Sequence, residues 1–343
     1  TQSGFIKRTT VDEFKIQNRG GKGVIGSGQK DEDPVSLLKT CNAHDTLMFF
    51  MQNGRVYVQK AYEIPEGSRT SKGRNTINFL EMQKDEMVSA IIAVDDFESE
   101  ASLVLCTKKG VVKKTKISAY KNHRKGGIIG INVDEGDSVL EALQIEKKDH
   151  LMILTSKGKG LRFDSNQLRD QGRVTRGVRG IKLKENDEVV NLLKVDDDKL
   201  LLIAGENGLG IRTQFSSFLP RGGETDENVE VSPRKRGGQG VIAMNTDGVC
   251  GAISVNPDSE ILMITNAGQT VRCEVQNIRE TSRGSKGVKL VNLSEKDRLV
   301  GVSEVVKIDE DDLEHENGTG FEDNTTLEAV KDSQNLNEES DEG

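Results

Sequence analysis

The chain has 343 residues and a formal net charge of −8, with 36 glycines, no tryptophan and four cysteines. No stretch approaches the 18 consecutive apolar residues of a membrane helix, and the cysteines never stand two residues apart, which argues against a membrane protein, a zinc knuckle and a disulfide framework. Short runs of valine, isoleucine and leucine between frequent glycines predict an all-β protein with many short strands. Because the first residues open into a strand pattern and not into a charged and apolar leader, we expect a cytoplasmic protein.

Five segments repeat one pattern, in which an apolar run leads to a turn with glycine and then to a more basic strand. They occupy residues 47–60, 103–116, 151–164, 200–213 and 261–274, and their turn glycines are Gly54, Gly110, Gly158, Gly208 and Gly268. We interpret each as a β-hairpin with a two-residue turn, because glycine supplies the positive φ that such a turn needs. The apolar runs are continuous, so we expect strands that neighbouring sheets cover on both faces.

A second element recurs between the hairpins, a basic glycine-rich turn that leads into another strand. It begins at Arg19, Arg69, Lys125, Arg176, Arg236 and Arg283, and its closing glycines are Gly23, Gly73, Gly130, Gly180, Gly240 and Gly287. A period of about 50 residues indicates a propeller or a solenoid, and six turns indicate six blades.

The two ends of the chain share one repeat. Residues 1–9 align with the second half of the hairpin at 107–115, and residues 283–308 stop where a further hairpin is due to begin. Pairing the last strand into the first blade removes exposed sheet edges, so we expect a closed ring over residues 1–308. The strand missing before Thr1 suggests that the chain is a fragment.

Residues 309–343 form a tail of different composition. They carry 14 acidic residues and one lysine, a net charge of −13, whereas residues 1–308 carry 47 basic and 42 acidic residues, a net charge of +5. A segment this polar does not support a packed core, so we expect it to be disordered. It either improves solubility or competes with DNA for the basic surface.

The basic turns and the second hairpin strands are the candidate DNA-binding surface. Cations beside glycines let a phosphate approach both the charge and the bare backbone N–H groups, and a regular period turns single contacts into a track. Aromatic residues make up only 4% of the chain and do not alternate with the cations, so duplex DNA fits better than a single strand. The candidate contacts are Lys7, Arg8, Arg69, Lys72, Lys113, Lys114, Arg124, Lys125, Arg162, Arg176, Arg179, Arg212, Arg234, Lys235, Arg236, Arg272, Arg283 and Lys286.

No catalytic residue, metal site or cofactor site is predicted in this chain. The four histidines are widely spaced, and the glycine motif at 205–210 is in register with the hairpin turns and precedes a strand. A nucleotide-binding glycine motif would instead precede a helix.

Residues 17–23, QNRGGKG, resemble the gyrase-A box QRRGGKG of the A chains of DNA gyrase at six of seven positions, with Asn18 as the difference. The resemblance extends through all six repeats, over about residues 1–308. It implies a six-bladed β-pinwheel, a propeller-like disc whose neighbouring blades exchange strands and which wraps duplex DNA. It also implies that Gln17, Arg19 and Lys22 hold the wrapped segment.

The resemblance further implies a non-catalytic domain of an ATP-hydrolysing type II topoisomerase that introduces negative supercoils. The ATP, the Mg²⁺ and the cleaving tyrosine would then belong to other parts of that enzyme. Its implied partners are the N-terminal cleavage domain of the same polypeptide and the gyrase B protein, in an A2B2 holoenzyme on the bacterial nucleoid. Two alternatives stay open: the similar domain of topoisomerase IV, which usually has a degraded or absent box, and a propeller hub that binds proteins.

Overall fold

The computed structural model describes residues 1, 3–10, 33, 37, 39, 41–68, 71–220, 231–246, 248–266, 270–294 and 296–305. Contacts divide the chain into two units, Thr1–Lys307 and Ile308–Gly343. The second unit corresponds to the expected acidic tail and lies outside the described residues, so the order of the tail stays a prediction. Every described strand belongs to the first unit.

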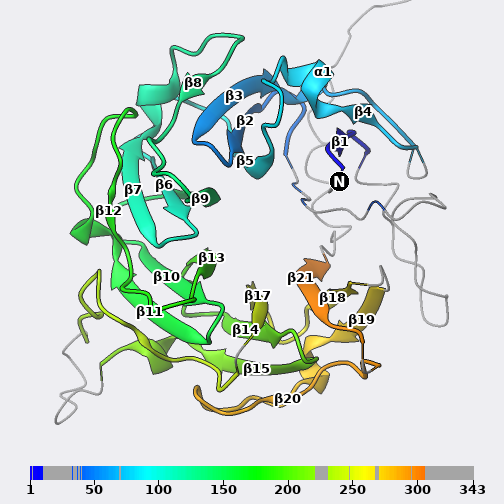
Figure 1. The fold of residues 1–343 in the computed structure, drawn as a ribbon, viewed down its shortest axis with the longest axis vertical. Helices are drawn as coiled ribbons and strands as arrows, with labels where there is room; N and C mark the ends of the chain where they lie inside the picture. Colours follow the sequence, from blue (N-terminus) through cyan, green and yellow to red (C-terminus); the bar gives the residue numbers. More distant parts are fainter. Residues whose placement is uncertain are drawn as a thin grey trace, which may run out of the picture. The chain divides into compact units, whose positions relative to one another are not determined.

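Five sheets, each built on one hairpin, make up most of the first unit (Figure 1). Four of them contain, from the inner to the outer edge, one long strand, the two hairpin strands and a strand of two residues. These are β5 (Val88–Val94), β2 (Thr46–Met51), β3 (Arg55–Lys60) and β8 (Ile128–Ile129); β9 (Val139–Ile145), β6 (Ser102–Thr107), β7 (Val111–Lys116) and β12 (Val178–Arg179); β13 (Val189–Lys194), β10 (His150–Thr155), β11 (Lys159–Asp164) and β16 (Val241–Ile242); and β17 (Val249–Val255), β14 (Leu200–Gly205), β15 (Leu209–Gln214) and β20 (Val288–Lys289).

The remaining strands lie in two smaller sheets. The fifth hairpin sheet has three described strands, β21 (Leu299–Val305), β18 (Glu260–Thr265) and β19 (Thr270–Glu274), and β1 (Phe5–Ile6) pairs with β4 (Arg74–Asn75). The inner strands β5, β9, β13, β17 and β21 contact one another in chain order. The five predicted hairpins are therefore confirmed, with their boundaries shifted by at most one residue.

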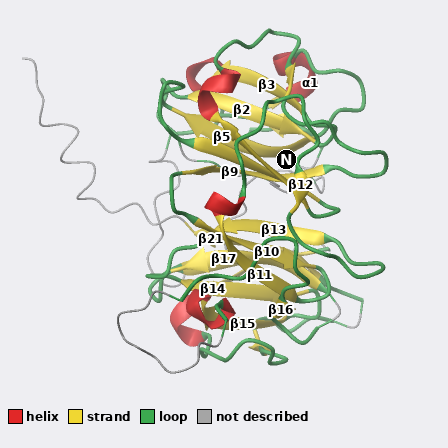
Figure 2. Ribbon diagram, turned by 90° about the vertical axis from the view of Figure 1, so that its left-hand side faces the viewer, coloured by secondary structure: helices red, strands yellow, loops and turns green. Residues whose placement is uncertain are grey.

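The helices are short and follow the strands. The 3-10 helices directly follow the second strands of the hairpins, whereas α1, drawn in red in Figure 2, follows the outer strand β4. They are α1 (Thr76–Leu80), η2 (Ala61–Glu63), η3 (Ile117–Tyr120), η4 (Ser165–Gln167), η5 (Phe215–Phe218) and η6 (Val275–Asn277). Over the described ranges, no helix is long and apolar enough to cross a membrane.

Neighbouring blades exchange strands. In the chain, β8 comes after the hairpin of the second sheet, yet Ile128 and Ile129 pair with Val56 and Arg55 of the first sheet. The outer strands β12, β16 and β20 pair in the same way with β7, β11 and β15. Each of these four blades is thus completed by the segment that has already passed through the next blade.

The core lies between successive sheets, and it explains the continuous apolar runs. In β2, Met48 and Phe50 pack toward the second sheet, whereas Leu47 and Phe49 pack in a separate cluster with residues of η2 and α1. The strands β6, β10 and β14 divide their side chains between two clusters in the same alternating way. Because a strand presents alternate residues to opposite faces, burial of both faces requires an unbroken apolar run.

The four hairpin loops whose glycine the structure describes have three residues, as 156–158 do between β10 and β11, which corrects the prediction of two-residue turns. In each of four described hairpins the glycine N–H donates to the carbonyl oxygen three residues earlier, as Gly158 does to Thr155 at 2.9 Å. The glycine φ is still positive, +68° at Gly158. This geometry is typical of longer hairpin loops that end on a left-handed glycine.

The ends of the chain do not pair with each other within the described residues. The last described strand, β21, pairs with β18 of the fifth sheet, and the N-terminal β1 pairs with β4. The expectation that the last strand joins the first blade is therefore not met there. The fifth sheet lacks an outer strand among the described residues, and the turn that sequence repetition assigns to it, at 19–26, lies outside them.

Candidate nucleic-acid interface

Each described glycine-rich turn ends on a glycine with positive φ that directly precedes the outer strand. These glycines are Gly73, Gly127, Gly177, Gly240 and Gly287, with φ between +68° and +89°. The alignment on Gly130 and Gly180 was therefore wrong by three residues in two turns. Both of these glycines follow the outer strand, and their N–H groups donate to the carbonyl oxygens of Gly54 and Gly110 at 2.8 and 2.7 Å.

The corrected register separates two positions in the turn. We call the position directly before the closing glycine the solvent position. In three of the turns it holds an exposed cation: Lys72, Arg176 and Lys286. We call the position four residues before the closing glycine the anchoring position. In three of the turns it holds a half-buried arginine: Arg173, Arg236 and Arg283. Two of the described turns, those of Arg173 and Arg283, thus carry both an outward cation and an inward cation, and only the outward one is placed for a phosphate.

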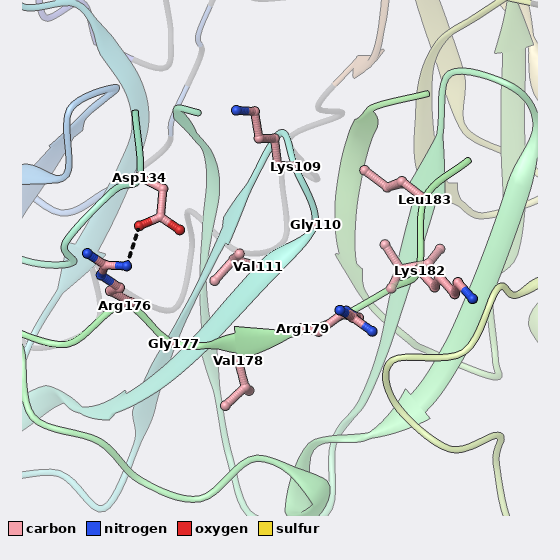
Figure 3. Close-up of a pocket in the computed structure, with 11 residues that line it drawn as sticks. Lys109, Gly110, Val111, Asp134, Arg176, Gly177, Val178, Arg179, Lys182 and Leu183 are labelled. Carbon is pink, nitrogen blue, oxygen red and sulfur yellow. Dashed lines mark ion pairs between the residues drawn. The ribbon is translucent and has the colours of Figure 1, made fainter. Parts of the chain in front are cut away.

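A groove of about 540 Å³ lies beside the outer strand β12 (Figure 3). Lys109, Arg176, Arg179 and Lys182 line it, and all four are exposed. Arg176 forms an ion pair with Asp134 at 3.2 Å in which the side chains are 77% and 52% exposed. Such an exposed pair is weak, so a phosphate oxygen could replace the carboxylate at little cost.

Two groove residues, Lys109 and Lys182, were missed by sequence reasoning. Lys109 stands directly before the hairpin glycine Gly110, and Lys182 follows the exchanged strand. The sequence signal was a lysine next to a turn glycine, but only the strand exchange brings the hairpin turn and the segment after β12 together.

Other predicted residues are also exposed. Arg124 and Lys125 lie on the turn before β8, and Lys235 lies before β16, all with exposed side chains. Arg234 is half-buried, and its Nε donates to the Phe218 carbonyl oxygen at 3.3 Å. The exposed cations of the turns therefore recur before several outer strands.

The cations on the second hairpin strands have protein partners. Lys7 donates to the carbonyl oxygens of Ser68 and Ser71, both at 3.0 Å. The remaining pairs are Arg8 with Glu66 at 3.1 Å, Lys114 with Asp170 at 3.5 Å, Arg212 with the Val275 carbonyl oxygen at 2.9 Å, and Arg272 with Glu260. The contacts of Lys7, Arg8, Lys114 and Arg212 connect a strand to the segment that passes beside it, whereas Arg272 pairs with the first strand of its own hairpin.

Two predicted DNA contacts are buried, and the structure corrects both. The Lys113 side chain is 0% exposed, and its Nζ donates to the carbonyl oxygens of Gly130, Gly172 and Arg173. Burial, together with the nearby Arg173 charge, lowers the pKa of Lys113 to about 8. This lysine holds turn carbonyls together and does not face a ligand.

Arg162 is the second correction. It is 3% exposed and binds both carboxylate oxygens of Asp197, at 2.7 and 2.6 Å. Its Nε also donates to Nδ1 of His150 at 3.2 Å. The repeat pattern led us to predict a DNA contact at Arg162. It did not reveal that Asp197, in the acidic turn after β13, pairs with this arginine.

Four predicted residues, Gln17, Arg19, Lys22 and Arg69, lie outside the described residues. Within the part of the chain that the structure describes, no group of three or more histidine, cysteine, aspartate or glutamate side chains could hold a metal ion. The geometry therefore presents separated cations on turns next to bare backbone, which suits repeated contacts with a polyanion.

Comparison with known proteins assigns this architecture. The family described as the DNA gyrase C-terminal domain, beta-propeller, matches residues 1–42, 45–95, 101–146, 149–196, 228–248 and 259–305. The six matched segments agree with six repeats, of which the structure describes five hairpin sheets. The chain is an all-β propeller of the pinwheel type, and it belongs to the DNA gyrase A C-terminal domain family.

Curated relatives agree with this assignment. The chain is 36% identical over 316 residues to the DNA gyrase A protein of Mycolicibacterium smegmatis and 39% identical over 318 residues to that of Clostridium acetobutylicum. These alignments cover 90% and 92% of the chain but only 36% and 37% of the relatives. The chain thus spans about a third of the length of the curated relatives it matches.

Solved structures share the fold. A DNA gyrase A C-terminal domain is similar with a TM-score of 0.71 and 29% identity, over 89% of this chain and 97% of that chain. The C-terminal domain of DNA topoisomerase IV is similar with a TM-score of 0.72 and 23% identity, over 89% and 91%. The second likeness concerns the fold alone.

Proposed function

We propose that this chain binds duplex DNA along the basic turns that precede its outer strands and bends the DNA around the propeller. The observation that carries this proposal is the repeated solvent position, where Lys72, Arg176 and Lys286 are exposed beside a glycine of positive φ. The groove beside β12 adds Lys109 and Lys182 to this track. Membership of the DNA gyrase A C-terminal domain family supports the same ligand.

The magnitudes are compatible with wrapping. Smooth bending of 20–30 base pairs by 40–90° costs on the order of 1–6 kcal/mol. Neutralising about six to ten phosphates changes the affinity by about 10³- to 10⁵-fold between 50 and 200 mM salt. Contacts with the backbone therefore suffice to offset the bending cost without base recognition. We expect little sequence specificity and a preference for DNA that bends easily.

In the whole gyrase A protein, we propose that the wrapped segment is presented to the cleavage domain in a fixed crossing sense. Strand passage driven by ATP would then introduce negative supercoils. The partners in this proposal are the N-terminal cleavage domain of the same polypeptide and the gyrase B protein, in the bacterial cytoplasm. The curated relatives, which are DNA gyrase A proteins, support this assignment over topoisomerase IV.

The salt dependence of DNA binding tests the proposal. We expect the logarithm of the association constant of residues 1–308 to fall linearly with the logarithm of the salt concentration, with a slope of about −0.9 for each phosphate contacted. A slope near zero would contradict backbone-driven wrapping. A protein-interaction hub would bind no duplex at any salt concentration.

The box residues are tested in the whole gyrase A protein. Replacing Arg19 and Lys22 by alanine should abolish supercoiling while relaxation and strand passage survive, because the other basic turns still bind DNA. Equal loss of all activities would mean that the box supports folding or catalysis. A domain of the topoisomerase IV type would bend DNA without imposing a strong superhelical sense.

A further inference from the structure

An arginine at the anchoring position connects two neighbouring blades. Arg283 Nε donates to the carbonyl oxygen of Ser217 in η5, at the end of the fourth sheet's hairpin, at 2.7 Å. Its Nη1 donates to the carbonyl oxygen of Ile242 in β16, the outer strand of the third sheet, at 3.3 Å. One guanidinium therefore joins the outer strand of one blade to the hairpin of the next.

The same connection recurs one blade earlier. Arg236 Nη1 donates to the carbonyl oxygen of Arg179 in β12, the outer strand of the second sheet. Its Nε reaches the carbonyl oxygen of Gln167 in η4, at the end of the third sheet's hairpin, at 3.4 Å. At the preceding junction, Arg173 Nη1 donates to the carbonyl oxygen of Ile129 in β8 at 3.3 Å. Three successive junctions thus contain an arginine bound to an outer-strand carbonyl.

The chemistry of arginine suits such a connection. Its planar guanidinium presents donors in a rigid fork, so two carbonyl oxygens held by one fork are fixed in distance and angle. A lysine ammonium keeps the charge but is a point donor on a flexible stem. The two carbonyls here belong to different blades, so the fork fixes one blade relative to the next at the outer strands.

We propose that Arg173, Arg236 and Arg283 are positioning residues that set the angle between successive outer strands and thereby the bend of the bound DNA. Arg173 and Arg283 act through the cations at the solvent position of the same turns, Arg176 and Lys286, which stand three residues later. The turn of Arg236 has Gln239 at that position, so Arg236 acts through the placement of the neighbouring blades. Changing the angle moves those cations without changing their number. The bend then changes while the count of neutralised phosphates stays constant. The inference rests on the proposed function, since it concerns the path of the DNA.

The test uses the full 343-residue chain with the double substitution R236K/R283K. Two quantities are measured: the salt slope of duplex binding, and the bend, as energy transfer between dyes at the duplex ends at saturating protein. We expect a salt slope within about 0.3 of the unsubstituted chain, because no phosphate contact is lost. We expect the gain in energy transfer on binding to be largely lost. Thermal melting checks the fold, and the single variant R173K repeats the test with a smaller change.

Matched controls separate the two positions. R169K makes the same change of side chain at the exposed Arg169, which stands at neither the anchoring nor the solvent position, and we expect it to leave both the salt slope and the bend unchanged. R176A/K286A should reduce the size of the salt slope by about 1.8, because two phosphate contacts are lost.

Two results would overturn the inference separately from the proposed function. One is an unchanged bend in R236K/R283K and in R173K. The other is a salt slope reduced by about 1.8 in R236Q/R283Q, which would make these arginines phosphate contacts. If the unsubstituted chain binds no duplex, the proposed function fails, and this inference fails with it.

Discussion

In the four hairpins whose turn glycine the structure describes, the segment after the exchanged strand crosses the turn at that glycine, so alanine at Gly158 should be strongly destabilising. Gly158 has a φ of +68°, and a Cβ there would lie 2.2 Å from the carbonyl oxygen of Met244. The left-handed conformation costs a non-glycine residue about 1–2 kcal/mol. Moving the crossing segment also weakens the bonds from Ala243 N and Met244 N to the Gly158 carbonyl oxygen, at 2.8 and 3.3 Å. At about 1 kcal/mol for each bond, the total loss is about 3–4 kcal/mol.

Two other glycines separate the causes. Gly237 has a φ of +80° but its nearest atom would be the Arg179 carbonyl oxygen at 3.6 Å, so alanine there should cost only about 1–2 kcal/mol. Gly172 has no positive φ and no atom within 4 Å, so alanine there should be neutral or stabilising by up to about 1 kcal/mol. The assay is urea unfolding of the three variants. Equal midpoints for Gly158→Ala and Gly172→Ala would refute the crossing argument.

Three further predictions concern charge. K109A/K182A should reduce the size of the salt slope of DNA binding by about 1.8, and an unchanged slope would place the DNA away from the groove. Burial lowers the pKa of Lys113 from 10.5 to about 8, so between these values the unfolded chain binds more protons and stability should rise with pH, by up to about 3 kcal/mol. K113M should flatten this rise in urea unfolding, and an equally steep rise would refute it. Cutting the chain after Ile308 should tighten DNA binding at low salt, because the tail is acidic; superimposed titration curves there would rule out autoinhibition.

The sequence predicted the hairpins well because their cause is local. A run of four apolar residues followed by a turn with glycine, as at 151–154 in β10 before Gly158, already specifies a strand buried on both faces and a turn. The strand exchange could not be read from such local signals. It pairs segments that lie far apart in the sequence, as Ile128 and Val56 do. The register of the turn before the outer strand was ambiguous as well, because GIIG at 127–130 and GVRG at 177–180 each offer two glycines, three residues apart, for the positive φ.

The candidate interface was predicted only in outline, because sequence shows where a cation stands and not what it contacts. Lys113 and Arg176 have the same formal charge, yet the first is enclosed by carbonyl oxygens and the second is 77% exposed. The alternation of residues along the strand did not predict the burial of Lys113, because its ammonium group donates to carbonyl oxygens of two other segments, at Gly130 and Arg173. Conversely, Lys109 joins Arg176 only through the exchanged strand β12.

The central claim is that this propeller bends duplex DNA in one superhelical sense. The most direct measurement is to bind the 343-residue chain to nicked circular DNA at low salt, ligate the nick, remove the protein and resolve the topoisomers. We predict a linking-number shift of one sign that grows with the ratio of protein to DNA and disappears at high salt. Binding that leaves the linking number unchanged, or a shift that high salt does not abolish, would contradict the account.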